Sequence, residues 1–151
     1  MKILSSLLIL VLVTALSCDK DKFTTIPQVT IKSISPDIVV NGNIISLEGE
    51  FTDQEGDVDS ALIVYKWYNG ATAVLFDTIV RQSFAAFQLP PKTKQAEISL
   101  DFEYNTFNTG LRTLTGPNIR DTTAAIGIIL IDKAGNRSAY AESPKIRLIK
   151  P

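Results

Sequence analysis

The stretch Ala96-Glu97-Ile98-Ser99-Leu100-Asp101-Phe102-Glu103-Tyr104 alternates apolar and polar residues without a break. Successive side chains of a β-strand point to opposite faces of a sheet, so this pattern predicts a strand with one dry face and one wet face. Residues 45–52 repeat the pattern, with Ile45, Leu47 and Phe51 on the dry side. Both segments indicate an all-β protein.

Further strand patterns and turn signals fill most of the chain after residue 27. Asn41-Gly42 and Asn69-Gly70 readily supply the positive φ angles of tight hairpins. No stretch carries a helical stripe of apolar residues. About seven short strands at this spacing predict a single antiparallel sandwich of two sheets. The additional strands are expected at about 28–34, 60–68, 72–80, 124–131 and 145–150.

Two of these strands carry more specific signals. The run from Ala124 to Ile131 is apolar on both sides of the alternation, which favours a central strand or one covered on both faces. Trp67 lies in the third strand, where sandwiches of the immunoglobulin (Ig) type commonly bury a tryptophan. We interpret Trp67 as a core anchor, and the alternative is an aromatic platform for a ligand.

Two short motifs carry a family resemblance. Phe51-Thr52-Asp53-Gln54-Glu55-Gly56-Asp57 resembles the turn after the second strand in bacterial PKD-like and cadherin-like repeats. Ile131-Asp132-Lys133-Ala134-Gly135-Asn136 is similar to the closing hairpin of bacterial Ig-like domains. With the strand spacing, the resemblance covers most of residues 28–150. It implies a single Ig-like β-sandwich domain over residues 28–151.

The N-terminal residues resemble a bacterial lipoprotein signal peptide. Lys2 is followed by an uncharged run from Ile3 to Leu16, and Cys18 is the only cysteine of the chain. The resemblance implies removal of residues 1–17 and attachment of lipid to Cys18, which would anchor the protein to a membrane. The alternative is an ordinary secretory signal with an incidental cysteine.

A charged segment follows Cys18. Asp19-Lys20-Asp21-Lys22 is similar to the charged patch behind the lipidated cysteine in lipoproteins of the Bacteroidetes kind. That resemblance implies an outer-membrane lipoprotein, on either the periplasmic face or the cell surface. The alternative is a solvated tether without an address. In both cases residues 18–27 are the lipidated cysteine and tether.

An acidic segment is the main candidate for a metal site. Six of the sixteen carboxylates fall within residues 48–59. In the expected topology the turn after the second strand and the closing hairpin share one end of the sandwich. Hard oxygen ligands suit calcium. The alternative is a solvated turn beside a hairpin in which Gly135 takes a left-handed conformation. The calcium ligands would be Asp53, Glu55, Asp57, Asp132 and Asn136.

Residues 105–123 form the longest stretch without a strand pattern, and loops of this length are usually functional or disordered. Following the chain up and down the sandwich places this loop at the end opposite the acidic turns, with the tether at the acidic end. The alternative is an extra hairpin that turns at Gly116-Pro117. The mixed apolar and basic residues of the expected contact surface are Phe107, Leu111, Arg112, Leu114, Ile119 and Arg120.

The composition argues against several classes of function. The net charge is −1 without a basic cluster, which argues against nucleic acid as a partner. The chain has no histidine and no glycine-rich phosphate loop, so no enzyme activity is expected. We expect a lipid-anchored binding or adhesion module for a protein or glycan ligand. The alternatives are a structural accessory subunit of an outer-membrane complex and a small glycoside hydrolase that uses Asp53 and Asp132.

Overall fold

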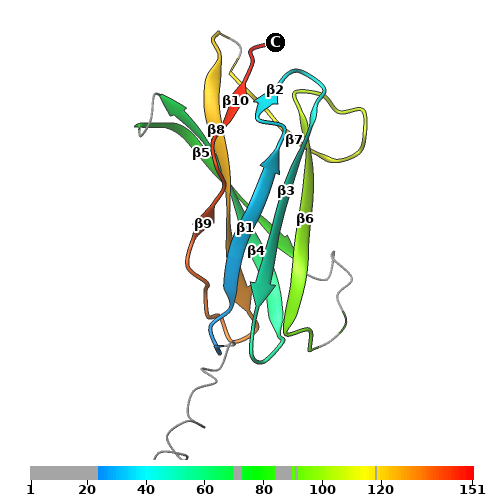
Figure 1. Cartoon of the computed structure of the whole chain (residues 1–151), viewed down its shortest axis with the longest axis vertical. Helices are drawn as coiled ribbons and strands as arrows, with labels where there is room; N and C mark the ends of the chain where they lie inside the picture. The colour runs from blue at the N-terminus through cyan, green and yellow to red at the C-terminus, as the bar shows by residue number, and fades with distance from the viewer. Residues whose placement is uncertain (1–23, 70–72, 84–89, 91, 118) are drawn as a thin grey trace, which may run out of the picture.

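The computed structural model describes residues 24–69, 73–83, 90, 92–117 and 119–151, and its regular structure is entirely β-strand (Figure 1). Residues 1–17, Cys18 and residues 19–23 lie outside the described residues, as does the signal peptide expected there. The described residues contain no helix that could span a membrane. The ten strands are β1 Gln28–Ser35, β2 Ile38–Val39, β3 Ile44–Thr52, β4 Val58–Asn69, β5 Ala73–Ser83, β6 Gln95–Tyr104, β7 Arg112–Leu114, β8 Thr122–Asp132, β9 Ala141–Glu142 and β10 Ile146–Leu148.

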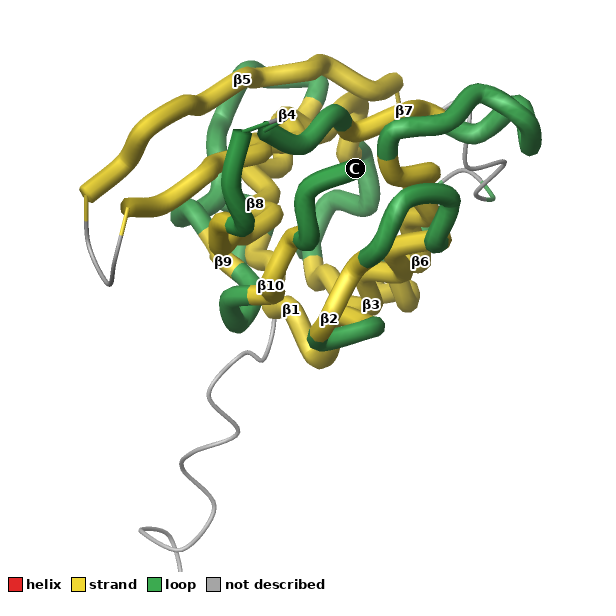
Figure 2. The backbone as a smooth tube through the Cα atoms, turned by 90° about the horizontal axis from the view of Figure 1, so that it is seen from above, coloured by secondary structure: helices red, strands yellow, loops and turns green. Residues whose placement is uncertain are grey.

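The strands form two sheets that pack face to face (Figures 1 and 2). One sheet has the order β1-β3-β6-β7, and the other has the order β2-β10-β8-β4-β5, with β9 paired to β8. Neighbouring strands are antiparallel except for two pairs, β10 with β2 and β6 with β7, which are parallel. The expected all-β architecture of two sheets is confirmed, while the expectation of purely antiparallel pairing is wrong.

The strand count also differs from the expected seven. Each segment with a clear alternation forms a strand close to its predicted position, including β3 and β6, which pair in register from Ile44 with Glu103 to Thr52 with Gln95. The additional strands are β2, β7 and β9, of two or three residues each. A segment that short is too brief to show a periodic pattern, so sequence reasoning could not find it.

The core lies between the two sheets. The apolar positions of the alternating strands point into it, as their pattern predicts. Trp67 is half-buried, packs against this core and meets the Tyr65 ring edge-on at 6.3 Å, which agrees with the core-anchor interpretation. The largest fully buried apolar side chains are Val39, Ile45, Leu47, Phe51, Tyr104, Ile126, Ile128, Leu130, Ile146 and Leu148.

Strand β8 is central, as its two apolar faces predict. It pairs with β4 along one edge and with β9 and β10 along the other. Its outward face is also covered, because the Tyr140 ring lies over Gly127. A Cβ atom at Gly127 would stand 2.2 Å from the Tyr140 ring, so only glycine allows this close approach.

The two ends of the sandwich differ (Figure 1). We call the end that carries the turns at residues 53–57 and 132–136 the proximal end and the opposite end the distal end. At the proximal end the backbone N–H of Gln54 donates to the carbonyl of Thr24 at 3.0 Å. The distal end carries the loop between β6 and β8 and the C-terminus. The described chain therefore begins beside the acidic turns, and the long loop lies at the opposite end, as expected from the topology.

Candidate functional site

The proximal end is organised by buried carboxylates. Asp53 is 0% exposed, and its Oδ2 accepts the backbone N–H of Asp57 at 2.8 Å, which closes the turn after β3. Gly56 has a φ of 64°, and a Cβ there would meet the backbone of Lys92 at 2.5 Å. Both observations explain why an aspartate and a glycine occupy these positions of the turn.

The second proximal turn has the same design. Asp132 is 2% exposed. Its Oδ1 accepts the backbone N–H of Asn136 and its Oδ2 accepts the side-chain amide of Asn136, both at 2.7 Å. Gly135 takes the expected left-handed conformation with a φ of 89°. The N–H of Lys133 donates to the carbonyl of Asp57 at 3.2 Å, which ties the two turns together.

Three carboxylates therefore converge at the proximal end. Burial raises the pKa of Asp57, and the charges of Asp53 and Asp132 and a hydrogen bond with the Asp53 carboxyl raise it further. The Oδ1 atoms of Asp53 and Asp57 are buried without a hydrogen-bond partner. Like charges held together out of water favour the binding of a proton.

The calcium prediction stays a prediction. Asp53, Asp57, Asp132 and Asn136 meet as expected, whereas Glu55 is exposed in the same turn. Within the described ranges no group of three or more His, Cys, Asp or Glu side chains is arranged to hold a metal ion. The other carboxylates of the acidic segment have separate partners: Glu48 accepts from Ser33, Glu50 pairs with Lys32, and Asp59 pairs with Arg81.

At the distal end the loop between β6 and β8 is built around Glu103. This residue was expected on the wet face of its strand, but it is 1% exposed because residues 106–109 fold over it. Its carboxylate accepts from the Thr106 hydroxyl, from the N–H of Asn108 at 2.9 Å, and from the N–H and hydroxyl of Thr109 at 2.9 and 2.7 Å. These hydrogen bonds, led by the one from Thr106, lower the pKa of Glu103 to about 2.

Residues 113–116 of the same loop are also held by hydrogen bonds. The side-chain oxygen of Asn105 accepts the N–H of Gly116 at 2.7 Å, and the Thr113 hydroxyl donates to the carbonyl of Thr106 at 2.7 Å. The Tyr65 hydroxyl donates to the carbonyl of Thr115 at 3.1 Å. Because β7 runs parallel to β6, the loop is not the extra hairpin considered as an alternative.

The expected contact residues divide into two groups. Phe107 and Ile119 are 81% and 87% exposed, and Leu111 is exposed to a smaller extent. Arg112 and Arg120 are also exposed. Leu114 is buried in the core, so its assignment to the contact surface is wrong. Its place in β7, which pairs with β6, turns its side chain inward.

Sequence reasoning missed a polar cluster on the outer face of the larger sheet. The Glu142 carboxylate accepts from Lys66 at 2.9 Å, from the Tyr68 hydroxyl at 2.7 Å and from the Tyr140 hydroxyl at 2.5 Å. The Lys66 ammonium lies 4.2 Å from the centroid of the Tyr140 ring. The residues come from β4 and from the chain around β9, so their spacing in sequence contains no signal of the contact.

No protein-family model and no curated protein matches this chain. Among solved structures, it is similar to the sporulation control protein Spo0M of Bacillus subtilis, with 13% identity and a TM-score of 0.47, over 85% of this chain and 51% of Spo0M. The chain thus spans about half the length of Spo0M. A Niemann-Pick type C2 protein from the Japanese carpenter ant matches with 10% identity and a TM-score of 0.44, over 89% of this chain and 100% of that protein.

A third similar structure is the CARDB domain of the PF1109 protein from Pyrococcus furiosus. It has 13% identity and a TM-score of 0.35, over 86% of this chain and 100% of the domain. Likeness at these levels of identity and TM-score carries no argument about the fold or the activity of this chain.

The raised pKa of Asp57 predicts a pH dependence at the proximal end. A group whose pKa is higher in the folded state contributes stability that is present below its unfolded value, 3.8, and is lost as the pH rises through the folded value. We therefore expect Asp57→Asn to melt at a higher temperature than the wild type at pH 7 and to lose that advantage near pH 3. Thermal melting followed by circular dichroism across this pH range measures the difference in melting temperature.

Glu55→Gln changes an exposed carboxylate of the same turn and should show no such crossover. Equal behaviour of the two variants would refute the assignment.

The lowered pKa of Glu103 predicts that its contribution to the stability of the distal end depends on pH in the opposite direction. Its contribution to stability is present above the unfolded value, 4.5, and is lost as the pH falls toward about 2. We expect Glu103→Gln to speed amide hydrogen exchange at Asn108 and Thr109 at pH 7, because an amide cannot accept from all the donors that the carboxylate satisfies. Glu97→Gln changes the same charge at an exposed position of β6 and should leave this exchange unchanged. Slow exchange in Glu103→Gln would show that the loop does not depend on the carboxylate.

Proposed function

We propose that this chain is a lipid-anchored cell-envelope protein whose Ig-like β-sandwich acts as a non-catalytic binding module. The ligand, a protein or a glycan, would be taken at the distal loop. The observation that carries this proposal is the 81% exposure of Phe107, which lies within residues 106–109 that the buried Glu103 carboxylate holds in place. Ile119, which is 87% exposed, lies farther along the same connection between β6 and β8. Exposed apolar side chains on an ordered loop favour binding, because less conformational entropy is lost when the ligand arrives.

Two further observations support a binding role. The connection between β2 and β3 is bonded to the base of the loop through the N–H of Gly42 and the carbonyl of Tyr104, at 2.9 Å. Val40 of this connection and Ile38 of β2 are exposed apolar residues, and β2 lies at the same end of the sandwich (Figure 1). The carboxylates considered for glycoside hydrolysis, Asp53 and Asp132, are buried, whereas a hydrolase needs both carboxylates to reach its substrate.

The position at which the tether joins the domain supports an orientation of the domain relative to the membrane. The described chain starts at the proximal end, where Thr24 is bonded to Gln54. A lipid on Cys18 would hold this end toward an outer membrane, on the periplasmic face or at the cell surface. The distal loop would then point away from the anchoring bilayer, where a ligand can reach it.

The binding role is tested at Phe107. With a photo-crosslinking amino acid in place of Phe107, we expect a discrete adduct on illumination of intact cells, and Phe107→Ser should reduce affinity for the captured ligand by at least about tenfold. Ile26 is an exposed apolar residue just before β1, at the proximal end, so the same probe at position 26 is the matched control. Equal labelling from both positions would contradict a specific surface at the distal loop.

The second candidate, a structural accessory subunit, makes a different prediction from the same surface. A subunit should co-purify in a fixed ratio with its partners from solubilised membranes, whereas a binding module should be isolated alone and capture its ligand afterwards. The exposed apolar residues at the distal end favour both, because permanent interfaces are also apolar at their centre.

The anchor is tested at Cys18. We expect Cys18→Ser to move the protein from the membrane fraction to the soluble fraction, because the acyl chains of a lipoprotein contribute about 0.8 kcal/mol for each buried methylene. Mass spectrometry of the wild-type N-terminal peptide should show a lipid-modified cysteine as its first residue. An unmodified Cys18, or a variant that stays with the membrane, would refute lipid anchoring.

A further inference from the structure

Strand β5 forms one margin of the larger sheet (Figure 2). Its 11 residues pair with β4 along one edge, and no strand of the described ranges pairs with its other edge. One register shift, opposite Trp67 and Tyr68, precedes a regular run over residues 76–83. The open edge of a strand presents a row of backbone N–H and C=O groups, so β5 is a template for one more strand.

The other edge strands are less suited to accept a strand. Strands β2, β7 and β9 have two or three residues each. Strand β1 has a register shift between Ile31 and Ser33, and Lys32 at this point pairs with Glu50 at 3.0 Å. Short strands, bulges and edge lysines prevent edge-to-edge pairing. Strand β5 contains neither lysine nor proline, so it is the long open edge of the described structure.

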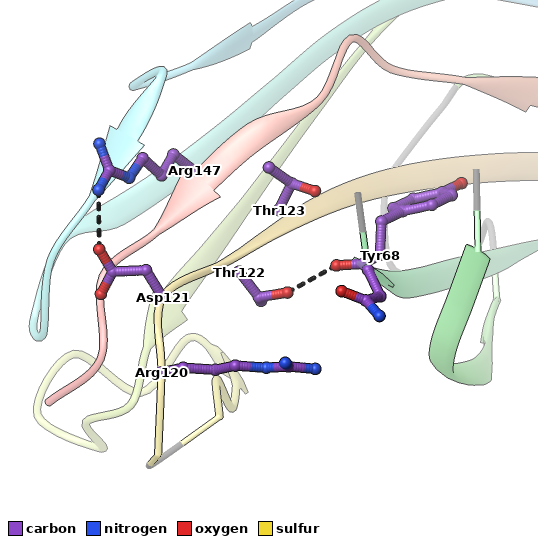
Figure 3. Close-up of a pocket in the computed structure, with 7 residues that line it drawn as sticks. Tyr68, Arg120, Asp121, Thr122, Thr123 and Arg147 are labelled. Atoms are coloured by element: carbon purple, nitrogen blue, oxygen red, sulfur yellow. Dashed lines mark hydrogen bonds and ion pairs between the residues drawn. The ribbon is translucent and has the colours of Figure 1, made fainter. Parts of the chain in front are cut away.

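The inner strands of the larger sheet are already joined to one another. Near the distal end the Thr122 hydroxyl of β8 donates to the carbonyl of Tyr68 of β4 at 2.8 Å, and Arg147 of β10 pairs with Asp121 at 2.9 Å (Figure 3). Strands β4, β8 and β10 each have a paired strand on both edges. A further strand can therefore join this sheet only at its margin.

The core side of β5 is also partly open. Val80 lies opposite Ile63 and Thr78 lies opposite Tyr65, and directly opposite residues of an antiparallel pair share one face of the sheet. Ile63 and Tyr65 are buried in the core, whereas Val80 and Thr78 are only half-buried. A strand added at this edge would cover apolar surface in addition to satisfying backbone groups.

The charges of β5 match a second copy of the same strand in antiparallel orientation. The strand has one acidic residue, Asp77, and one basic residue, Arg81, with Ile79 midway between them. When two copies pair about Ile79, position 77 of each copy lies opposite position 81 of the other. Only this two-fold register places opposite charges face to face, and a register centred on either charged residue opposes like charges. Directly facing opposite charges stabilise a pair of strands, and like charges destabilise it.

Arg81 is able to change partners. Its side chain is 63% exposed, and its Nη2 lies 3.5 Å from the carboxylate of Asp59, whose side chain is 48% exposed. Its Nε and Nη2 also donate to the Ser60 hydroxyl, at 3.2 and 3.0 Å. Ion pairs between exposed groups contribute little to stability, so little is lost when Arg81 turns toward a carboxylate of a second copy.

From these features we infer that β5 is a self-association edge, which pairs antiparallel about Ile79 with β5 of a second copy and joins the two larger sheets into one. The two-fold axis reverses the second copy, so the two tethers leave the pair in opposite directions. Such a pair joins copies on two facing surfaces. This last consequence rests on the lipid anchor proposed above, whereas the pairing itself goes beyond the proposed function.

Charge reversal tests the register in the purified full-length chain, with sedimentation velocity under reducing conditions as the measurement. We expect the wild type to dimerise as its concentration rises. Asp77→Arg and Arg81→Asp should each weaken dimerisation by at least about tenfold, because two like-charge pairs replace two opposite-charge pairs. A mixture of the two variants should dimerise again, since each charge then faces its opposite. Asp37→Arg reverses an exposed charge outside β5 and should leave dimerisation unchanged.

Disulfide cross-linking tests the geometry of the pair. In a chain that also carries Cys18→Ser, Ile79→Cys should form a linked dimer under mild oxidation. Directly opposite Cα atoms of antiparallel strands are about 4.5–5.5 Å apart, which is within the range of a disulfide. Gln82→Cys is the matched control, because position 82 faces position 76 of the second copy in this register.

Beads test the facing arrangement. Cys18 is the single thiol of the chain, so coupling through it reproduces attachment by the tether. Beads that carry Asp77→Arg should aggregate with beads that carry Arg81→Asp and not among themselves. Dimers in solution without aggregation of the mixed beads would overturn the facing arrangement.

Three outcomes would overturn the assignment of β5 itself. These are a wild type that stays monomeric, a mixture of the two charge variants that stays monomeric, and equal cross-linking at positions 79 and 82. Phe107→Ser should leave dimerisation unchanged. Loss of the ligand captured at Phe107 with intact dimers would concern only the proposed function.

Discussion

The burial of β8 on both faces is the constraint on which the rest of the structure depends. Its inward side chains Ile126, Ile128 and Leu130 fill the core, while its outward face accommodates the Tyr140 ring at Gly127. A strand buried in this way must have its backbone hydrogen bonds satisfied along both edges, because unpaired buried amides are costly. Strand β4 pairs along one edge, and β9 and β10 share the other. Strands β2 and β5 extend this sheet from β10 and β4, and the second sheet packs against its inner face.

Buried carboxylates organise both ends of the sandwich, with opposite electrostatic results. At the proximal end Asp53 and Asp132 each accept a backbone N–H within a short turn, and their charges combine to raise the pKa of Asp57. At the distal end Glu103 stands alone among hydroxyl and amide donors, which lower its pKa to about 2. Burial and neighbouring negative charges therefore raise the pKa of Asp57, whereas hydrogen-bond donors outweigh burial at Glu103 and lower its pKa.

The sequence predicted what depends on neighbouring residues and was less informative where distant residues meet. Alternation located β3 and β6, and Gly135 has the positive φ angle that its place in the hairpin suggested. The short strands were missed because two or three residues show no period. Leu114 and Glu103 were placed on the surface, since no local pattern shows that β7 pairs with β6 and that residues 106–109 cover a carboxylate. The proximal meeting of Asp53, Asp57 and Asp132 was predicted from topology alone.

The sequence by itself determined the all-β class, the positions of the long strands, the apolar character of β8 and the turns at each end, because periodicity and turn chemistry are local properties. Only the tertiary structure decided which strands pair in parallel, which carboxylates are buried, and which residues of the distal loop stay exposed. It also brought Thr123 of β8 beside Tyr68 of β4 and Arg147 of β10 across three neighbouring strands. These features require residues far apart in the chain to meet, and packing between the two sheets sets those distances.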